Sequence, residues 1–470
     1  MVLNVILVGS NPLPCYIQVA YVADENRKDI DILKKPDKYL FVYSNETKQY
    51  YKNICYILKK EKVNILKDNI ISLDLEDKSR DGRKIEEKIE EKVNTILQND
   101  NNLEEIIVNF TGGTKVMAVA STKILRKICE DKEIQYSEIY VDSIKNKINM
   151  SSKINGENIL PRNGDLRDCI KISIENLIKL HYGETCEVDF IKSKEKNEQE
   201  NEKIINQATK ELANNIFNGN DKHYRNYVSY IGFYLDSEKI HNFNEIYAIK
   251  NHTEYEEIIK HIKSLKKMKA EELLEKTQEY ISLKGANYNI DYIPDALNII
   301  KLNENQDFKN IKEIKNVLKG IWFERYFYLA MLEAKKRLKE QQNIDIEIGW
   351  SCKVKPKIEN GKDFEIDIVA SRGYSLYVFS LTIDNNQGIS KSKFFEVVYR
   401  TNQMSGEFGK VTMVTFLDES DDKAKKEVAK FRKDLESFST NIYSNAEIWG
   451  NSQVNDEEKL IQNIMNRIGK

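Results

Sequence analysis

The chain has 470 residues, which is long enough for two or three domains that each bury a hydrophobic core. Its 73 basic and 75 acidic residues give a formal charge of −2, which excludes a polycationic nucleic-acid binder and leaves room only for a local basic groove. No apolar run reaches the roughly 20 residues of a membrane helix, and the N-terminus lacks the basic segment of a secretory signal, so we expect a cytoplasmic protein without membrane contact.

The first 160 residues alternate between short apolar runs and helical patterns. Each run is rich in β-formers, and a charged helix is expected between the third and the fourth run. Such alternation is typical of an α/β domain with a mostly parallel sheet that is covered on both faces. The predicted strands are Val5–Val8, Tyr39–Tyr43, Asn69–Leu75, Ile106–Phe110 and Glu138–Val141.

Two of these predicted strands run directly into loops of small, polar, turn-forming residues. The first loop contains Ser10, Asn11 and Pro12, and the second reads Asn-Phe-Thr-Gly-Gly-Thr-Lys from Asn109 to Lys115. A helix follows each loop, so unpaired backbone N–H groups and the helix dipole would attract an anion, and the missing β-carbons of the glycines would let a phosphate come close. The alternative is a tight strand-to-helix turn whose lysine is only solvated.

The second loop is neither a Walker loop nor a GxGxxG fingerprint. Because ligands collect where the carboxyl ends of parallel strands meet, we expect the two loops to share one crevice. The candidate ligand-binding residues are Ser10, Asn11, Pro12, Thr111, Gly112, Gly113, Thr114 and Lys115.

The pair VGSNPLP and NFTGGTKVMA resembles the loops of the CARF domain, the cyclic-oligoadenylate sensor of type III CRISPR systems. This resemblance implies a Rossmann-like sensor domain over residues 1–160, with cyclic tetra-adenylate as the expected activator. It also implies a homodimer, because the two-fold symmetry of the ligand would match that of a dimer. Residues 161–310 carry many charges and only modest apolar stripes, and we expect a helical connector or insertion there.

Residues 311–470 predict a second α/β domain, with a helix over Ile321–Leu338 and an antiparallel hairpin that feeds a helix from Ser390 to Met404. In the run from Lys362 to Val369, acidic and apolar residues alternate, so Asp363, Glu365 and Asp367 would share one face of a strand. Carboxylates at this spacing suit Mg²⁺ or Mn²⁺. The alternative is a half-exposed strand whose acids are only solvated.

A helix with Glu324, the acidic strand, a second strand and a basic helix follow in the order of the PD-(D/E)xK nuclease core. The chain is thus similar to CARF-fused nucleases that serve as CRISPR ancillary effectors. The resemblance implies that Glu365 and Asp367, with Glu324, bind the metal ion. One departure is that Thr382 occupies the usual lysine position of the second strand, so the domain is either a dead nuclease or one whose lysine has moved to the next helix.

The candidate lysine is Lys393, with Lys391 as the alternative on a neighbouring helical face. Lys393, Glu396, Arg400 and Gln403 have the spacing of one polar face. We expect Glu396 in the catalytic group, and Arg400 and Gln403 on a neighbouring phosphate of the nucleic acid.

The sequence therefore predicts a nuclease for DNA or RNA that is metal-dependent, activated by cyclic oligoadenylate and active in antiviral defence. One alternative is a sensor whose degenerate nuclease domain only binds nucleic acid or a partner. A second is a ring nuclease that degrades its own activator with Thr111 and Lys115.

Overall fold

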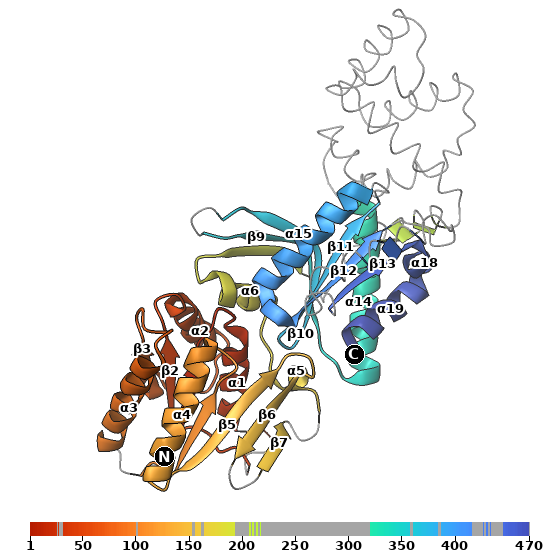
Figure 1. Cartoon of the computed structure of the whole chain (residues 1–470). Coiled ribbons are helices and arrows are strands. Elements are labelled where there is room, and N and C mark those ends of the chain that lie inside the picture. The colour runs from red at the N-terminus through yellow and green to blue at the C-terminus, as the bar shows by residue number, and fades with distance from the viewer. Residues whose placement is uncertain are drawn as a thin grey trace, which may run out of the picture.

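The computed structural model describes two α/β units and parts of the segment between them (Figure 1). The described residues are 1–192 except 26, 28–31, 100, 101, 153–155 and 161–163; 206, 207, 209, 210, 213, 214 and 217; 320–415 except 358–360 and 384–386; 426, 429, 430 and 433; and 445–469. No helix in this part of the chain is long and apolar enough to cross a membrane.

The first unit is a sheet in the order β3-β2-β1-β4-β5-β6-β7, in which the first five strands are parallel and the last two pair antiparallel. This is the predicted Rossmann-like arrangement. Its elements are β1 (Val2–Leu7), α1 (Leu13–Ala23), β2 (Lys38–Tyr43), α2 (Lys48–Lys60), η1 (Lys67–Asn69), β3 (Ile70–Asp74), α3 (Gly82–Asn99), β4 (Glu105–Asn109), α4 (Lys115–Asp131), β5 (Gln135–Asp142), β6 (Lys147–Ser152) and β7 (Gly156–Leu160).

Helices cover both faces of this sheet, which is why β1 and β4 are buried along their whole length. α3 has a regular apolar stripe, Ile85, Ile89, Val93 and Ile96, and packs with α4 on one face. α1 and α2 pack on the other face, where Tyr16 and Ile54 belong to a second core cluster. The strand ends that carry the two candidate loops therefore project from a rigid, fully covered sheet.

The second unit is a mixed sheet in the order β13-β12-β11-β10-β9-β8. β10 and β11 form the predicted antiparallel hairpin, and β12 runs parallel to β11 after the intervening helix α15. The elements are β8 (Glu187–Lys192), α14 (Trp322–Gln342), β9 (Glu347–Lys355), β10 (Phe364–Arg372), β11 (Ser375–Thr382), α15 (Gln387–Ser405), η4 (Gly406–Phe408), β12 (Gly409–Thr415), β13 (Ala446–Trp449), α18 (Asn451–Val454) and α19 (Glu457–Gly469).

The two faces of the second sheet meet different helices. Val378 of β11 lies in the same core cluster as Phe394 of α15. The neighbouring Phe379 points to the other face, where its ring centroid is 5.2 Å from that of Phe327 in α14. The alternation along β11 thus separates the α15 face from the α14 face.

Between the two sheets the chain forms α5 (Leu166–Cys169) and α6 (Ile174–Tyr182), and α6 lies between the two units (Figure 1). The expected helical connector over 161–310 falls mostly outside the described residues. Within the described part, α5 and α6 are helices, but Glu187–Lys192 is strand β8, which was not expected, and it pairs with β9 at the edge of the second sheet.

One core cluster joins the two units. It contains Ile6 and Phe41 of the first sheet, Leu177 of α6, and Val369 and Phe394 of the second unit. The two sheets therefore share buried apolar surface through α6.

Candidate functional site

The two candidate loops of the first unit lie against each other. β1 and β4 are adjacent and parallel, so both loops leave the same edge of the sheet. A β-carbon on Gly9 would lie only 2.8 Å from the backbone nitrogen of Gly113, and one on Gly112 would lie 2.1 Å from the carbonyl oxygen of Leu7. The structure therefore brings the two loops together at one place, and the glycines are required there by close backbone packing.

Both loops end at helix N-termini. α1 begins after Pro12, and α4 begins at Lys115, so two positive helix ends meet at this edge of the sheet. Ser10 and Lys115 are exposed, and Lys115 makes no hydrogen bond or ion pair with the described residues. These groups are available to an anionic ligand.

The two threonines have structural tasks that the sequence did not indicate. The Thr114 hydroxyl caps α4 by accepting from the Met117 backbone N–H at 3.1 Å, and it donates to the carbonyl of Ser79 at 3.1 Å. The Thr111 hydroxyl accepts from the Val141 N–H at 2.8 Å. The Thr114 hydroxyl therefore both donates and accepts within the protein. The Thr111 hydroxyl only accepts, so its hydrogen can still be donated to a ligand.

Asn11 connects the first loop to elements outside the first sheet. Its Oδ1 atom accepts from the Leu13 N–H at 3.2 Å and lies 3.3 Å from Nε2 of His181 in α6. A β-carbon on Gly406, at the end of α15, would meet the Asn11 amide nitrogen at 2.4 Å. Burial lowers the pKa of His181 to about 4, so its ring is neutral at physiological pH. Asn11 thus faces the second unit as well as the loop.

In the second unit, the structure brings Asp367 and Lys393 together. The Lys393 ammonium lies 3.2 Å from Oδ2 of Asp367 and donates to the carbonyl of Leu381 at 2.8 Å. The same Oδ2 atom accepts the Leu381 backbone N–H at 2.7 Å. The Asp367 side chain is only 16% exposed and that of Lys393 is 39% exposed. α15 therefore delivers a lysine to the acid of β10, beside the strand that carries Thr382.

The two glutamates flank this pair. Glu324 of α14 is half-buried and accepts from the Trp350 indole N–H at 3.2 Å. Burial, together with the negative charge of Asp367, raises the pKa of Glu324 to about 7. Glu365 is exposed at the start of β10 and accepts a hydrogen bond from the Ser351 hydroxyl.

The remaining predicted residues of α15 lie differently. Glu396 is exposed, with its carboxylate 4.0 Å from the Arg400 guanidinium. Arg400 packs over the Phe364 ring at 4.5 Å from its centroid and donates to Gln403, which also accepts from the Tyr182 hydroxyl at 3.0 Å. The structure thus uses Arg400 and Gln403 at the contact with α6. The side chain of Lys391 lies outside the described residues.

The donor set can be compared with the needs of a divalent cation. Asp367, Glu324 and Glu365 each use one oxygen in the hydrogen bonds above, and in the described part of the chain the other oxygen of each has no hydrogen-bond partner. No three His, Cys, Asp or Glu side chains of the described residues gather closely enough to hold a metal ion. Mg²⁺ needs only one or two protein carboxylates, since it keeps waters and takes substrate phosphates. The residues therefore fit Mg²⁺ or Mn²⁺ held by Asp367 with one glutamate.

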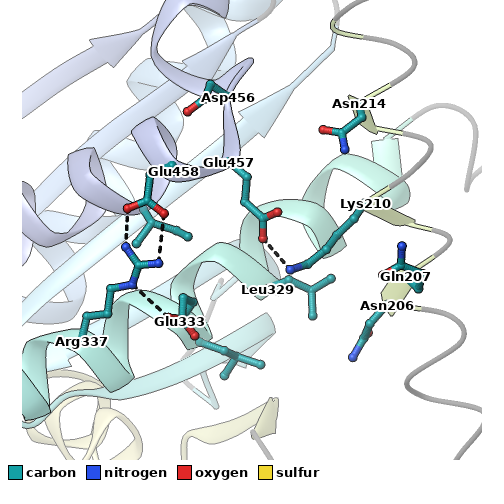
Figure 2. Close-up of a pocket in the computed structure, with 12 residues that line it drawn as sticks. Asn206, Gln207, Lys210, Asn214, Leu329, Glu333, Arg337, Asp456, Glu457 and Glu458 are labelled. Carbon is teal, nitrogen blue, oxygen red and sulfur yellow. Dashed lines mark hydrogen bonds and ion pairs between the residues drawn. The ribbon is translucent and has the colours of Figure 1, made fainter.

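A polar pocket of about 800 Å³ lies elsewhere in the second unit, between α14, the start of α19 and the side chains of Asn206, Gln207, Lys210 and Asn214 (Figure 2). Its charged side chains largely pair with one another: Arg337 bridges Glu333 and Glu458, and Lys210 reaches Glu457 at 2.6 Å. None of the predicted site residues lines it.

Sequence reasoning missed Trp350 and Ser351, which contact the two glutamates, and His181, which contacts Asn11. Trp350 and Ser351 lie on β9, and their positions depend on pairing with β8 and β10. No local pattern in the sequence signals such a tertiary contact.

Comparison with known proteins identifies the first unit. Residues 19–159 match the family model of the Card1 CARF domain, which confirms the predicted CARF domain. The whole fold is similar to that of protein VC1899 from Vibrio cholerae, with a TM-score of 0.59 and 11% identity over 100% of this chain and 99% of that chain. It is also similar to Can2 from Sulfobacillus thermosulfidooxidans in complex with cyclic tetra-adenylate, with a TM-score of 0.56 and 16% identity over 99% of each chain. A search of curated proteins found no match.

Proposed function

We propose that this chain, whose N-terminal unit contains a CARF domain of the Card1 type, is a metal-dependent nuclease that cyclic tetra-adenylate activates in type III CRISPR defence. The described fold supports a two-part molecule, with a ligand-binding edge on the first sheet and a carboxylate–lysine pair on the second.

The ligand assignment rests on the two loops of the first unit. Two helix N-termini and exposed Lys115 supply positive potential at the place where the glycines let the two loops pack together. Can2, which shares the fold, has been solved with cyclic tetra-adenylate. A two-fold symmetric ring would be shared by two copies of the chain, so we infer a homodimer.

The nuclease assignment rests on the approach of Lys393 to Asp367. Thr382 occupies the usual lysine position of the second strand. The observation that carries the proposal is that α15 places another lysine near the acid, with the Lys393 ammonium 3.2 Å from the Asp367 carboxylate. This is the geometry expected of a lysine that has moved to the helix. This contact argues against the alternative of a degenerate domain, because a domain that does not cleave would not require an ammonium group beside the carboxylate of Asp367.

In the proposed reaction, Asp367 and Glu365, or Glu324 in place of Glu365, would hold Mg²⁺ or Mn²⁺. The bound ion would supply polarisation of the scissile phosphate and a lowered pKa for the attacking water. Lys393 would stabilise the negative charge that develops on the phosphate, and Asp367 keeps the ammonium oriented. Leu381 fixes both partners, because its N–H binds Asp367 and its carbonyl binds Lys393.

The test is a cleavage assay with purified full-length protein, Mn²⁺, cyclic tetra-adenylate and labelled single- and double-stranded DNA and RNA. Asp367→Ala should abolish metal-dependent cleavage, and Lys393→Ala should lower turnover by about 10² to 10³-fold, the usual loss of one charge-stabilising group. Both variants should keep wild-type affinity for cyclic tetra-adenylate.

Lys339→Ala removes an exposed lysine of α14 and should cleave like wild type. Full activity in Lys393→Ala with loss in Lys391→Ala would move the role to Lys391. Absence of metal-dependent cleavage by wild type on all four substrates would refute the nuclease and favour a binding-only domain.

A further inference from the structure

We propose that Ser351 is a positioning residue of the carboxylate site. Its backbone conformation interrupts β9, and this interruption places Trp350 on Glu324 and the Ser351 hydroxyl on Glu365. The inference rests on the proposed function, since it assigns Ser351 to the geometry of the same metal-binding acids.

The first observation is the backbone of Ser351. It lies in the middle of β9 with a φ of 53°, in the left-handed region that a residue with a β-carbon rarely adopts. Such a conformation is strained and persists only where the surroundings enforce it. At this point the register of β8 against β9 shifts by one residue, between the pairs Asp189–Lys353 and Ile191–Trp350. Ser351 therefore sits in a β-bulge.

The second observation is that the bulge changes which face of the sheet the side chains occupy. Trp350 stacks on Tyr328 of α14, with ring centroids 5.4 Å apart. Cys352, only two residues further, is buried in the cluster that contains Phe394 of α15. Residues two apart in a regular strand share a face. The left-handed turn at Ser351 thus sends Trp350 to the α14 face.

The third observation is what the two residues touch. The Trp350 indole donates to Glu324 at 3.2 Å, and the Ser351 hydroxyl donates to Glu365. The register of β9 with β10 places Ser351 directly across from Asp367, between the pairs Cys352–Ile366 and Trp350–Ile368. Two consecutive residues of β9, opposite Asp367, therefore each hold one of the two glutamates.

These contacts predict a graded series of substitutions. Asparagine adopts the left-handed conformation readily and keeps a hydrogen-bond donor, glycine keeps the conformation without a donor, and β-branched valine disfavours it strongly. If Ser351 merely filled space, the effects of these substitutions would be ranked by side-chain size and not in this order.

The experiment is calorimetric titration of Mn²⁺ into full-length protein without nucleic acid. Ser351→Val should lower Mn²⁺ affinity by about 10 to 100-fold, the usual effect of losing a residue that orients metal ligands. Ser351→Asn should bind like wild type, and Ser351→Gly should fall between the two. Trp350→Phe keeps the ring on Tyr328 but removes the donor to Glu324, and it should also weaken Mn²⁺ binding.

Lys355→Val, at an exposed position of the same strand, is the matched control and should leave Mn²⁺ affinity unchanged. All variants should keep wild-type affinity for cyclic tetra-adenylate, which reports on the fold of the other unit. Wild-type Mn²⁺ affinity in folded Ser351→Val would overturn the positioning role. If Ser351→Val does not fold, wild-type Mn²⁺ affinity in both Ser351→Gly and Trp350→Phe would overturn it. A wild-type protein that binds no Mn²⁺ would overturn the proposed function together with this inference.

Discussion

Glu324 should make the stability of the folded chain depend on pH. Burial, with the charge of Asp367, raises the pKa of its carboxyl from 4.5 to about 7. As the pH rises between these two values, the unfolded state loses its proton first, so the folded state loses stability relative to it. For one such group the loss amounts to about 1 kcal/mol at pH 5 and about 3 kcal/mol at pH 8. Glu324→Gln removes this penalty, so its stability relative to wild type should be about 2 kcal/mol greater at pH 8 than at pH 5.

The assay is urea unfolding of wild type and Glu324→Gln at pH 5 and pH 8, with a chelator present so that no cation neutralises the site. Glu396→Gln, which alters an exposed glutamate of α15, should change the free energy of unfolding by less than about 0.5 kcal/mol at either pH. Equal differences between wild type and Glu324→Gln at the two pH values would refute the argument, because they would mean that Glu324 ionises alike in the folded and unfolded chain.

Two further predictions concern the ligand loops. Gly112→Ala should destabilise the protein by about 2 kcal/mol or more, because the new β-carbon would lie 2.1 Å from the carbonyl oxygen of Leu7 and the backbone of both loops must move. Thermal unfolding measures this loss, and an unchanged midpoint would contradict the close packing. Lys115→Ala should weaken cyclic tetra-adenylate binding by about 10 to 100-fold, the value of one hydrogen bond to a charged group, and should leave the unfolding midpoint unchanged. Calorimetric titration measures the affinity, and an unchanged value would make Lys115 an ordinary surface lysine.

The first sheet could be predicted because its central strands are buried on both faces. Such strands read as continuous apolar runs, as in Val5–Val8, and glycine-rich turns separate them from amphipathic helices. The hairpin of β6 and β7 was missed because its strands mix polar and apolar residues. β8 was missed because its partner, β9, lies far along the chain, and a strand whose pairing is so distant carries little local signal.

The candidate nuclease site was predictable to the extent that it follows from periodicity. The two-residue period of β10 and the helical spacing of α15 agree with the observed contact between Asp367 and Lys393, whose catalytic roles stay a prediction. The same helical spacing put Arg400 beside them, but sequence could not tell that Phe364 and Tyr182 occupy that part of the face. The role of Ser351 could not be predicted from sequence, because neighbouring strands impose its left-handed backbone conformation, which serine on its own rarely adopts.

Because one apolar cluster joins both sheets through α6, we expect the two units to unfold together as one cooperative block. A fragment cut near residue 160 would leave α2 without α6, to which the Asn53 amide donates at the Leu180 carbonyl, so we expect it to aggregate or to be digested quickly by proteases. For the same reason, a ligand that binds only the folded first unit protects the second. At 100 times its dissociation constant, such a ligand adds about 2.7 kcal/mol to the unfolding free energy of the whole block. Amide hydrogens in β11 and β12 should therefore exchange more slowly when a ligand is bound at the loops of the first sheet.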